Sequence, residues 1–287
     1  MTISIVVPTR DRPRKLRRCL AALRAQGSGD LEIVVVDDGS ADAEAVAGTA
    51  EAAGARLVRL RGRGAAAARN AGASAAHGEI VCFTDDDCEP RPGWAEALAA
   101  PIRRGDAECA AGRTVVAADA SAADRAWQAI ADHLQRTAAA PGSPSRGFAP
   151  TCNLACSRPL FDRIPFDESF PAAAGEDRDW AARVAALGMA PRFAPKAVVV
   201  HRPDLDARSF LRQQYGYGAG AARFRAAGND RRLGSPGFYA SLLRGGFAAG
   251  PDAGALVCAA QLATAAGIAA ERLRAAPGFS ARAAARR

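Results

Sequence analysis

Short runs of apolar, mostly β-branched residues alternate with amphipathic stretches over the first part of the chain. Four of these runs fit buried strands, at residues 3–7, 31–36, 56–60 and 79–84. The stretches between them carry apolar residues at helical spacing, from Pro13, over 43–53 and over 65–76. Because the connections are short, the alternation predicts an α/β fold with parallel strands and helices on both faces of the sheet.

The pattern changes after residue 106, where the strand-like runs become more widely spaced. Runs at 108–116, 149–157 and 197–201 fit further strands. Helices are expected over 122–139 and from Gly175 to about Gly188, and the tail from Ser209 is mostly helical, with breaks at its glycines. We therefore expect one domain over 1–205, with halves at about 1–115 and 116–205, and a helical C-terminal extension over 206–287.

Composition narrows the class of protein. The chain has 287 residues, 49% of them hydrophobic and 24% charged, which excludes general disorder and allows a large core. The net charge of +8 suits an anionic partner, but no zinc-finger spacing or RNA-binding aromatic motif accompanies it, so nucleic acid is not expected. Seven cysteines without a CxxC pair, and no visible signal peptide, favour a reduced, cytoplasmic protein.

Polar residues follow the predicted strands directly. In a parallel sheet the carboxyl ends of the strands share one edge, where ligands bind. The residues delivered to that edge are Thr9, Arg10, Asp11, Asp37, Asp38, Asp85, Asp86 and Asp87. Asp85 and Asp87 are spaced to point the same way, and one or two carboxylates together with substrate phosphates hold Mg²⁺ or Mn²⁺. An acidic N-terminal turn of the helix that begins near Trp94 is the alternative.

Six segments together resemble family 2 glycosyltransferases of the GT-A fold. They are SIVVPTRDR near the start, VVVDDGS (34–40), ARNAG (68–72), CFTDDDC (82–88), GEDRDW (175–180) and the pair Val200–His201. The resemblance covers about residues 3–205 and implies a single Rossmann-like sheet flanked by helices. It also implies sugar transfer from a nucleoside-diphosphate sugar, UDP-sugars first, with inversion and with the help of Mg²⁺ or Mn²⁺. The first half would then bind the donor and the second half the acceptor.

The resemblance also implies roles for individual residues. The donor nucleotide would be held by Pro8, Thr9, Arg10, Asp11, Asp37, Asp38, Arg69, Asn70, Asp85 and Asp86. Asp87 would be the direct metal ligand, with Asp85 nearer the ribose and His201 completing the metal shell. Other readings stay open: residues 37–40 as a turn and cap, Arg69 as a solvated helix residue, and His201 as a structural histidine.

The general base is expected on the helix that begins at Gly175. Inversion needs one carboxylate to take the proton of the attacking hydroxyl. Asp177 shares an inward stripe with Trp180, Ala181 and Val184 at i, i+3, i+4 and i+7, whereas Glu176 falls toward the more polar face. We therefore predict Asp177 as the base, the residue that the ED pair of the family also indicates. An acidic turn that complements the helix dipole is the alternative.

Two other functions remain possible. A sugar nucleotidyltransferase would show a Gly-rich basic segment after the first strand, which this chain lacks, and a non-catalytic nucleotide-sugar-binding module would not need Asp177.

The sequence does not indicate whether the acceptor is a glycan, a lipid-linked sugar or a small molecule. The acceptor loop is expected within 138–148. Residues 253–270 are uncharged and precede Arg272 and Arg274, which favours a packed or interfacial helix and peripheral contact with the inner face of the plasma membrane.

Overall fold

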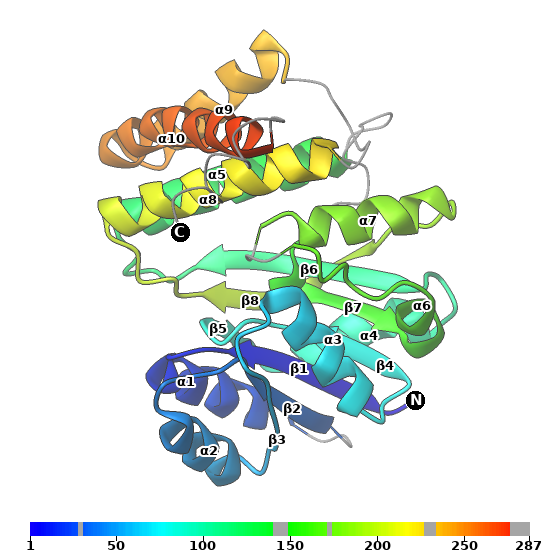
Figure 1. Cartoon of the computed structure of the whole chain (residues 1–287). Coiled ribbons are helices and arrows are strands. Elements are labelled where there is room, and N and C mark those ends of the chain that lie inside the picture. Colours follow the sequence, from blue (N-terminus) through cyan, green and yellow to red (C-terminus); the bar gives the residue numbers. More distant parts are fainter. Residues whose placement is uncertain (28–30, 140–148, 171–173, 227–233, 276–287) are drawn as a thin grey trace. The chain divides into compact units, whose positions relative to one another are not determined.

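The computed structural model describes residues 1–27, 31–139, 149–170, 174–226 and 234–275 (Figure 1). The chain forms two compact units. The first, here called the sheet unit, comprises Met1–Ala118, Ala138–Pro171 and Glu176–Pro203. The second, the helical unit, comprises Asp119–Thr137, Ala172–Gly175 and Asp204–Arg287. The expected acceptor half is therefore shared between the two, because residues 119–137 group with the C-terminal helices.

Eight strands form the sheet of the first unit. Their order is β3 (Arg56–Arg59), β2 (Leu31–Asp37), β1 (Ile3–Thr9), β4 (Ile80–Phe83), β7 (Leu154–Ser157), β6 (Cys109–Val116), β8 (Arg192–His201) and β5 (Cys88–Pro90). The first four run parallel, as the alternation predicted. Beyond β4 the sheet is mixed, because β7 is antiparallel to both β4 and β6, and β5 is antiparallel to β8. The three-residue β5 was not predicted from the sequence, being too short to show a hydrophobic period.

Both faces of this sheet are covered. Alternate residues of β1 point to opposite faces, so Ile5 packs in one core and Val6 in the other. The first core is completed by α1 (Pro13–Arg24), α2 (Ala43–Ala52) and α4 (Trp94–Arg103). The second is completed by α3 (Ala65–Ala75), α6 (Arg158–Arg163) and α7 (Glu176–Ala186). The uniformly apolar strands of the sequence are thus explained by burial on two sides.

Two details differ from the predicted elements. The run 149–157 is a 3₁₀ turn (Thr151–Asn153) followed by β7, because Asn153 turns inward, accepts a hydrogen bond from Trp94 Nε1 at 2.8 Å and donates one to the Ala197 carbonyl. The short α6 has only six residues and shows no helical period in the sequence. Residues 140–148 of the expected acceptor loop lie outside the described residues.

The helical unit consists of α5 (Ala122–Ala139), α8 (Ala207–Ala226), α9 (Pro236–Ala248) and α10 (Pro251–Ala275), which share a core. The sequence analysis predicted breaks at the glycines of α8. This prediction was wrong, because α8 runs without a break from Ala207 to Ala226. A Cβ on Gly218 would lie 2.1 Å from the Thr264 carbonyl oxygen, and one on Gly267 would lie 2.0 Å from that of Tyr215. Glycine is needed there because α8 and α10 approach backbone to backbone.

Candidate active site

The loops after β1 and β4 are joined by a buried hydrogen bond. The Thr9 hydroxyl donates to Asp86 Oδ2 at 2.7 Å, and the Asp38 amide donates to the Thr9 carbonyl oxygen at 2.9 Å. Burial, together with the charge of Asp87, raises the pKa of Asp86 to about 6. The carboxyl ends of β1, β2 and β4 therefore meet at one edge, as the topology predicted. Thr9 and Asp86 face each other there.

The acidic pair after β2 shapes its own loop. Asp37 accepts from the Ser40 amide at 2.9 Å, the turn that the sequence left open as an alternative. Both oxygens of Asp38 accept backbone amides, from Arg63 at 2.7 Å and Gly64 at 2.8 Å, so this carboxylate fixes the start of α3. A donor base that approaches Asp38 would meet a side chain already oriented by two hydrogen bonds.

Three of the expected nucleotide residues lie around the loop after β1. Pro8 is part of β1, opposite Val36. Arg10 is exposed, and its Nε lies 3.7 Å from Asp11 Oδ2. Asp11 adopts a positive φ of 56°, and its carboxylate accepts from the Ala41 amide at 2.7 Å. This strained position is stabilised by contacts with the loop after β2, which gives the rim of the site a defined shape.

Asp87 and His201 meet where β5 pairs with β8. The backbone register places Cys88 opposite His201, and the Arg202 amide donates to the Asp87 carbonyl oxygen at 2.8 Å. His201 Nε2 then lies 3.3 Å from Asp87 Oδ1. Burial alone would raise the pKa of Asp87 and lower that of His201. The contact between them outweighs burial, so the pKa of Asp87 is lowered and that of His201 is raised.

The donor set of this pair fits a divalent cation. Ligand atoms of Asp87, Cys88 and His201 lie within 4.8 Å of one another. A carboxylate oxygen and an imidazole nitrogen are ligands that Mn²⁺ accepts. Asp85, the other expected metal ligand, instead forms an ion pair with Arg69 at 2.8 Å. The structure thus brings Asp87 and His201 together and turns Asp85 toward α3.

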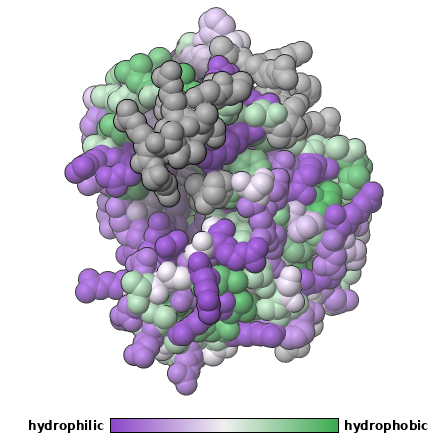
Figure 2. All heavy atoms as spheres, in the orientation of Figure 1, coloured by the Kyte–Doolittle hydropathy of each residue, from purple (hydrophilic) through white to green (hydrophobic). Residues whose placement is uncertain are grey.

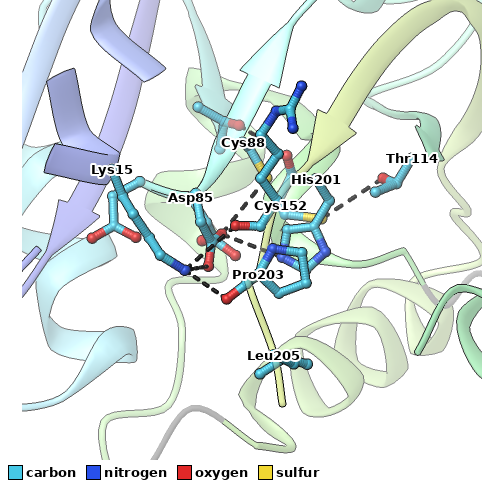
Figure 3. A network of polar contacts seen from close by, with 12 residues as sticks. Lys15, Asp85, Cys88, Thr114, Cys152, His201, Pro203 and Leu205 are labelled. Carbon is cyan, nitrogen blue, oxygen red and sulfur yellow. Dashed lines mark hydrogen bonds and ion pairs between the residues drawn. The ribbon is translucent and has the colours of Figure 1, made fainter. Parts of the chain in front are cut away.

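Two cations at the start of α1 were missed from the sequence. Arg12 Nη1 lies 3.2 Å from Asp86 and 3.3 Å from Asp87. Lys15 lies 3.9 Å from Asp87, and its amino group donates to the Pro203 carbonyl oxygen at 2.6 Å. In Figure 3, Lys15 and His201 lie on opposite sides of Asp85. The signal that could have indicated them is their position, since Arg12 directly precedes α1 and Lys15 lies in its first turn, next to the loop after β1.

The start of α7 carries the expected base. Trp180, Ala181 and Val184 are buried, as the stripe predicted. Glu176, however, is also buried, with 3% of its surface exposed, whereas Asp177 is half-buried. The expectation that Glu176 faces the polar side was wrong, because Glu176 pairs with Arg69 at 2.9 Å. Burial raises the pKa of Asp177, and burial together with the Asp177 charge raises that of Glu176 to about 7.

Arg69 and Asn70 lie side by side on α3 and have different contacts. Arg69 is 4% exposed rather than solvated, and its two terminal nitrogens contact Glu176 and Asp85. Asn70 exchanges two hydrogen bonds with the backbone of Phe166, at 2.9 and 3.0 Å. Asn70 therefore orders the loop that precedes α7.

Comparison with known proteins agrees with this geometry. The model of glycosyl transferase family 2 matches residues 4–164. The chain belongs to this family. The pre-mycofactocin glycosyltransferase of Mycobacterium tuberculosis is 30% identical over 229 residues, which are 77% of this chain and 47% of that protein. The chain thus spans about half the length of this relative. Glycosyltransferase AglE of Haloferax volcanii is 25% identical over 76% of this chain and 72% of its own length.

Solved structures share the fold of this family 2 chain. Glucosyl-3-phosphoglycerate synthase of Mycobacterium tuberculosis, in complex with Mn²⁺, UDP and phosphoglyceric acid, aligns with a TM-score of 0.58 at 22% identity. The alignment covers 77% of this chain and 76% of that one. The mannosyltransferase PcManGT of Pyrobaculum calidifontis, in complex with GDP-Man and Mn²⁺, has a TM-score of 0.58 at 21% identity. It covers 99% of this chain and 78% of that one. The GT-A fold expected from the sequence is confirmed.

Proposed function

We propose that this protein is an inverting glycosyltransferase that moves a sugar from a nucleoside-diphosphate sugar to an acceptor hydroxyl, with a divalent cation. The observation that carries the proposal is the meeting of Asp87 and His201 at the carboxyl edge of the sheet, within the family 2 segment. Ion pairs through Arg69 join the same edge to the start of α7, where Asp177 lies. A nucleotide site and a candidate base therefore belong to one connected network in the sheet unit.

The donor is proposed to be a UDP-sugar. Solved structures of the same fold hold UDP in one case and GDP-Man in another, so both nucleotides suit this architecture. In this chain the residues around the loops after β1 and β2, Pro8 to Asp11 with Asp37 and Asp38, would line the base and ribose. Asp85 and Asp86 follow β4 and would lie on the ribose side of the proposed metal ligands.

Asp87 and His201 would hold Mg²⁺ or Mn²⁺. Bound there, the cation would act as a Lewis acid toward the departing diphosphate. Arg12, 53% of whose side chain is exposed beside Asp87, is placed to add positive charge on the same side. Arginine suits this work because its planar guanidinium matches the geometry of phosphate oxygens.

Asp177 would accept the proton of the attacking hydroxyl. Burial raises the pKa of Asp177, which makes it a stronger base than an exposed aspartate. The Arg178 amide donates a hydrogen bond to Asp177 Oδ1 at 2.8 Å. Half-buried at the start of α7, it can be reached by an acceptor.

Donor turnover tests the proposal. The purified protein is incubated with UDP-, GDP- and dTDP-sugars, with and without Mn²⁺, and release of the nucleoside diphosphate is followed. Metal-dependent release from one donor, abolished in Asp177→Asn, supports a transferase. Binding of the nucleotide without release over a panel of acceptors would support a binding module instead, and release of pyrophosphate from a nucleoside triphosphate would support a nucleotidyltransferase.

We also propose that α10 contacts an anionic membrane surface on the cytoplasmic side. By length and composition α10 is able to cross a membrane, with a mean hydropathy of 1.7 over its most apolar window. Its exposed face is apolar over several turns, at Ala255, Cys258, Leu262, Ala265, Ala266, Ala269 and Leu273. The exposed Arg272 and Arg274 follow, which suits anionic headgroups. Figure 2 shows a patch of hydrophobic side chains at the upper left, where Figure 1 draws α9 and α10.

Vesicle sedimentation tests this contact. We expect binding to phosphatidylglycerol vesicles, weaker binding to phosphatidylcholine vesicles, and loss of binding in Leu262→Glu. Phe193→Glu is the matched control, because Phe193 is 58% exposed but belongs to β8 of the sheet unit. Unchanged sedimentation of Leu262→Glu would remove α10 from this role.

A further inference from the structure

Arg69 is occupied by protein carboxylates on both sides. Nη1 contacts Glu176 Oε1 at 2.9 Å and Nη2 contacts Asp85 Oδ1 at 2.8 Å. The side chain is buried, and its guanidinium carbon lies 6.0 Å from the centre of the Phe166 ring. Each of the two terminal nitrogens of Arg69 thus pairs with a carboxylate of the protein itself. Arg69 therefore bridges two parts of the protein, beside the donor-nucleotide role that the sequence predicts for it.

The bridge joins the two sides of the proposed reaction. Asp85 lies two residues after the end of β4 and two residues before Asp87, on the proposed donor and metal side. Glu176 begins α7 and directly precedes Asp177, on the base side. One buried cation thus connects the backbone that carries the metal ligand with the backbone that carries the base.

Among the described residues, Arg69 is the side chain that pairs with Glu176. Oε1 binds Arg69, while Oε2 is buried without a hydrogen-bond partner among the described residues. Burying a carboxylate with one of its oxygens unsatisfied is costly. The remainder of α7 is anchored separately, because Trp180 Nε1 donates to the Ile164 carbonyl oxygen at 2.8 Å. Glu176 is therefore not needed to dock the middle of the helix and acts at its first turn.

We propose that Glu176 is a positioning residue that, through Arg69, sets the distance between Asp177 and the donor site. This inference rests on the proposed function. A carboxylate base must lie within hydrogen-bond reach of the proton it takes. Small displacements of the reacting groups therefore lower the reaction rate strongly. The Asp85–Arg69–Glu176 bridge holds that distance with two buried ion pairs, independently of the donor.

Kinetics of three variants test the inference. Glu176→Gln keeps the size of the side chain and removes its charge, Glu176→Asp shortens it by one methylene, and Asp179→Asn is the matched control. Asp179 lies on the same helix and forms an ion pair of the same kind with Arg183 at 2.7 Å, but this pair does not reach β4. For each variant, Mn²⁺-dependent donor turnover gives kcat and KM, titration calorimetry gives the Kd of UDP with Mn²⁺, and thermal unfolding gives Tm.

We expect both Glu176 variants to lower kcat about 10- to 100-fold while the Kd of UDP stays within about twofold. The kcat–pH profile of Glu176→Gln should lose the step near pH 7 that deprotonation of Glu176 contributes in the wild type, because Gln does not titrate. Asp179→Asn keeps the wild-type kcat and pH profile.

A lowered Tm with unchanged kcat and pH profile in both Glu176 variants would show a purely structural role and overturn the inference. A parallel loss of UDP binding would also overturn it, by placing the effect on the donor. Absence of any donor turnover in the wild type would overturn the proposed function, and this inference with it.

Discussion

His201 Nε2 lies 3.3 Å from Asp87 Oδ1, although the two residues come from distant parts of the chain. The contact is built on the pairing of β5 with β8, which sets Cys88 opposite His201 and leaves Asp87 at the open end of the pair. Glu89 is opposite Val200 in the same ladder. Its side chain therefore points to the face of the sheet opposite to that of Cys88 and His201.

This arrangement predicts which carboxylate binds the metal. Asp87→Asn should weaken Mn²⁺ binding in the presence of UDP by about 100-fold or more, because loss of a ligand exceeds the 10- to 100-fold cost of losing a supporting contact. His201→Ala should weaken it as well. Calorimetry with Mn²⁺ measures both. Glu89→Gln, one strand position from Cys88, should bind Mn²⁺ as the wild type does, and equal losses in all three variants would contradict the assignment.

Asp177→Asn separates chemistry from binding. The amide keeps the shape of the side chain but takes no proton, so kcat should fall about 10²- to 10⁴-fold while the Kd of UDP is unchanged. Turnover near that of the wild type would remove Asp177 from the role of base. Circular dichroism of the variant checks that α7 is retained.

The stability of the protein should depend on pH through Glu176. A pKa raised to about 7 means that the folded chain binds this proton more tightly than the unfolded chain does, where the pKa is about 4.3. The stabilising contribution is therefore complete below about pH 4.3 and is lost as the pH rises through about 7. Gln does not titrate, so the free energy of unfolding of the wild type minus that of Glu176→Gln should decrease from about pH 5 to about pH 8. Urea unfolding at several pH values in metal-free buffer measures this difference, and a difference that grows with pH would contradict the raised pKa.

The close approach of α8 and α10 predicts a sharp contrast between glycines. Gly267→Ala should destabilise the protein by about 1–3 kcal/mol, because its Cβ would fall 2.0 Å from a backbone oxygen and the helices would have to separate. Gly216→Ala, on α8 with nothing within 4 Å of the added Cβ, should be neutral or stabilising by about 0.5–1 kcal/mol. Thermal unfolding compares the two variants, and similar Tm values would argue against a packed contact at Gly267.

The sequence predicted the parallel half of the sheet and the residues at its edge, because hydrophobic period and strand-end polarity are local signals. It did not predict the mixed half, since β5 has only three residues and the antiparallel pairing of β7 depends on long-range contacts. Arg69 shows the same limit. On a helical pattern an arginine is expected at the surface, and only the meeting of α3, β4 and α7 reveals that two carboxylates bury it.

The spacing of Asp87 and His201 is governed by main-chain hydrogen bonds between β5 and β8, with the Arg202 amide fastened to the Asp87 carbonyl. Side-chain substitutions around the pair leave that ladder in place. In a chimaera between relatives, β5 and β8 must therefore be exchanged together. Exchanging one strand alone would change the pairing that holds His201 next to Asp87.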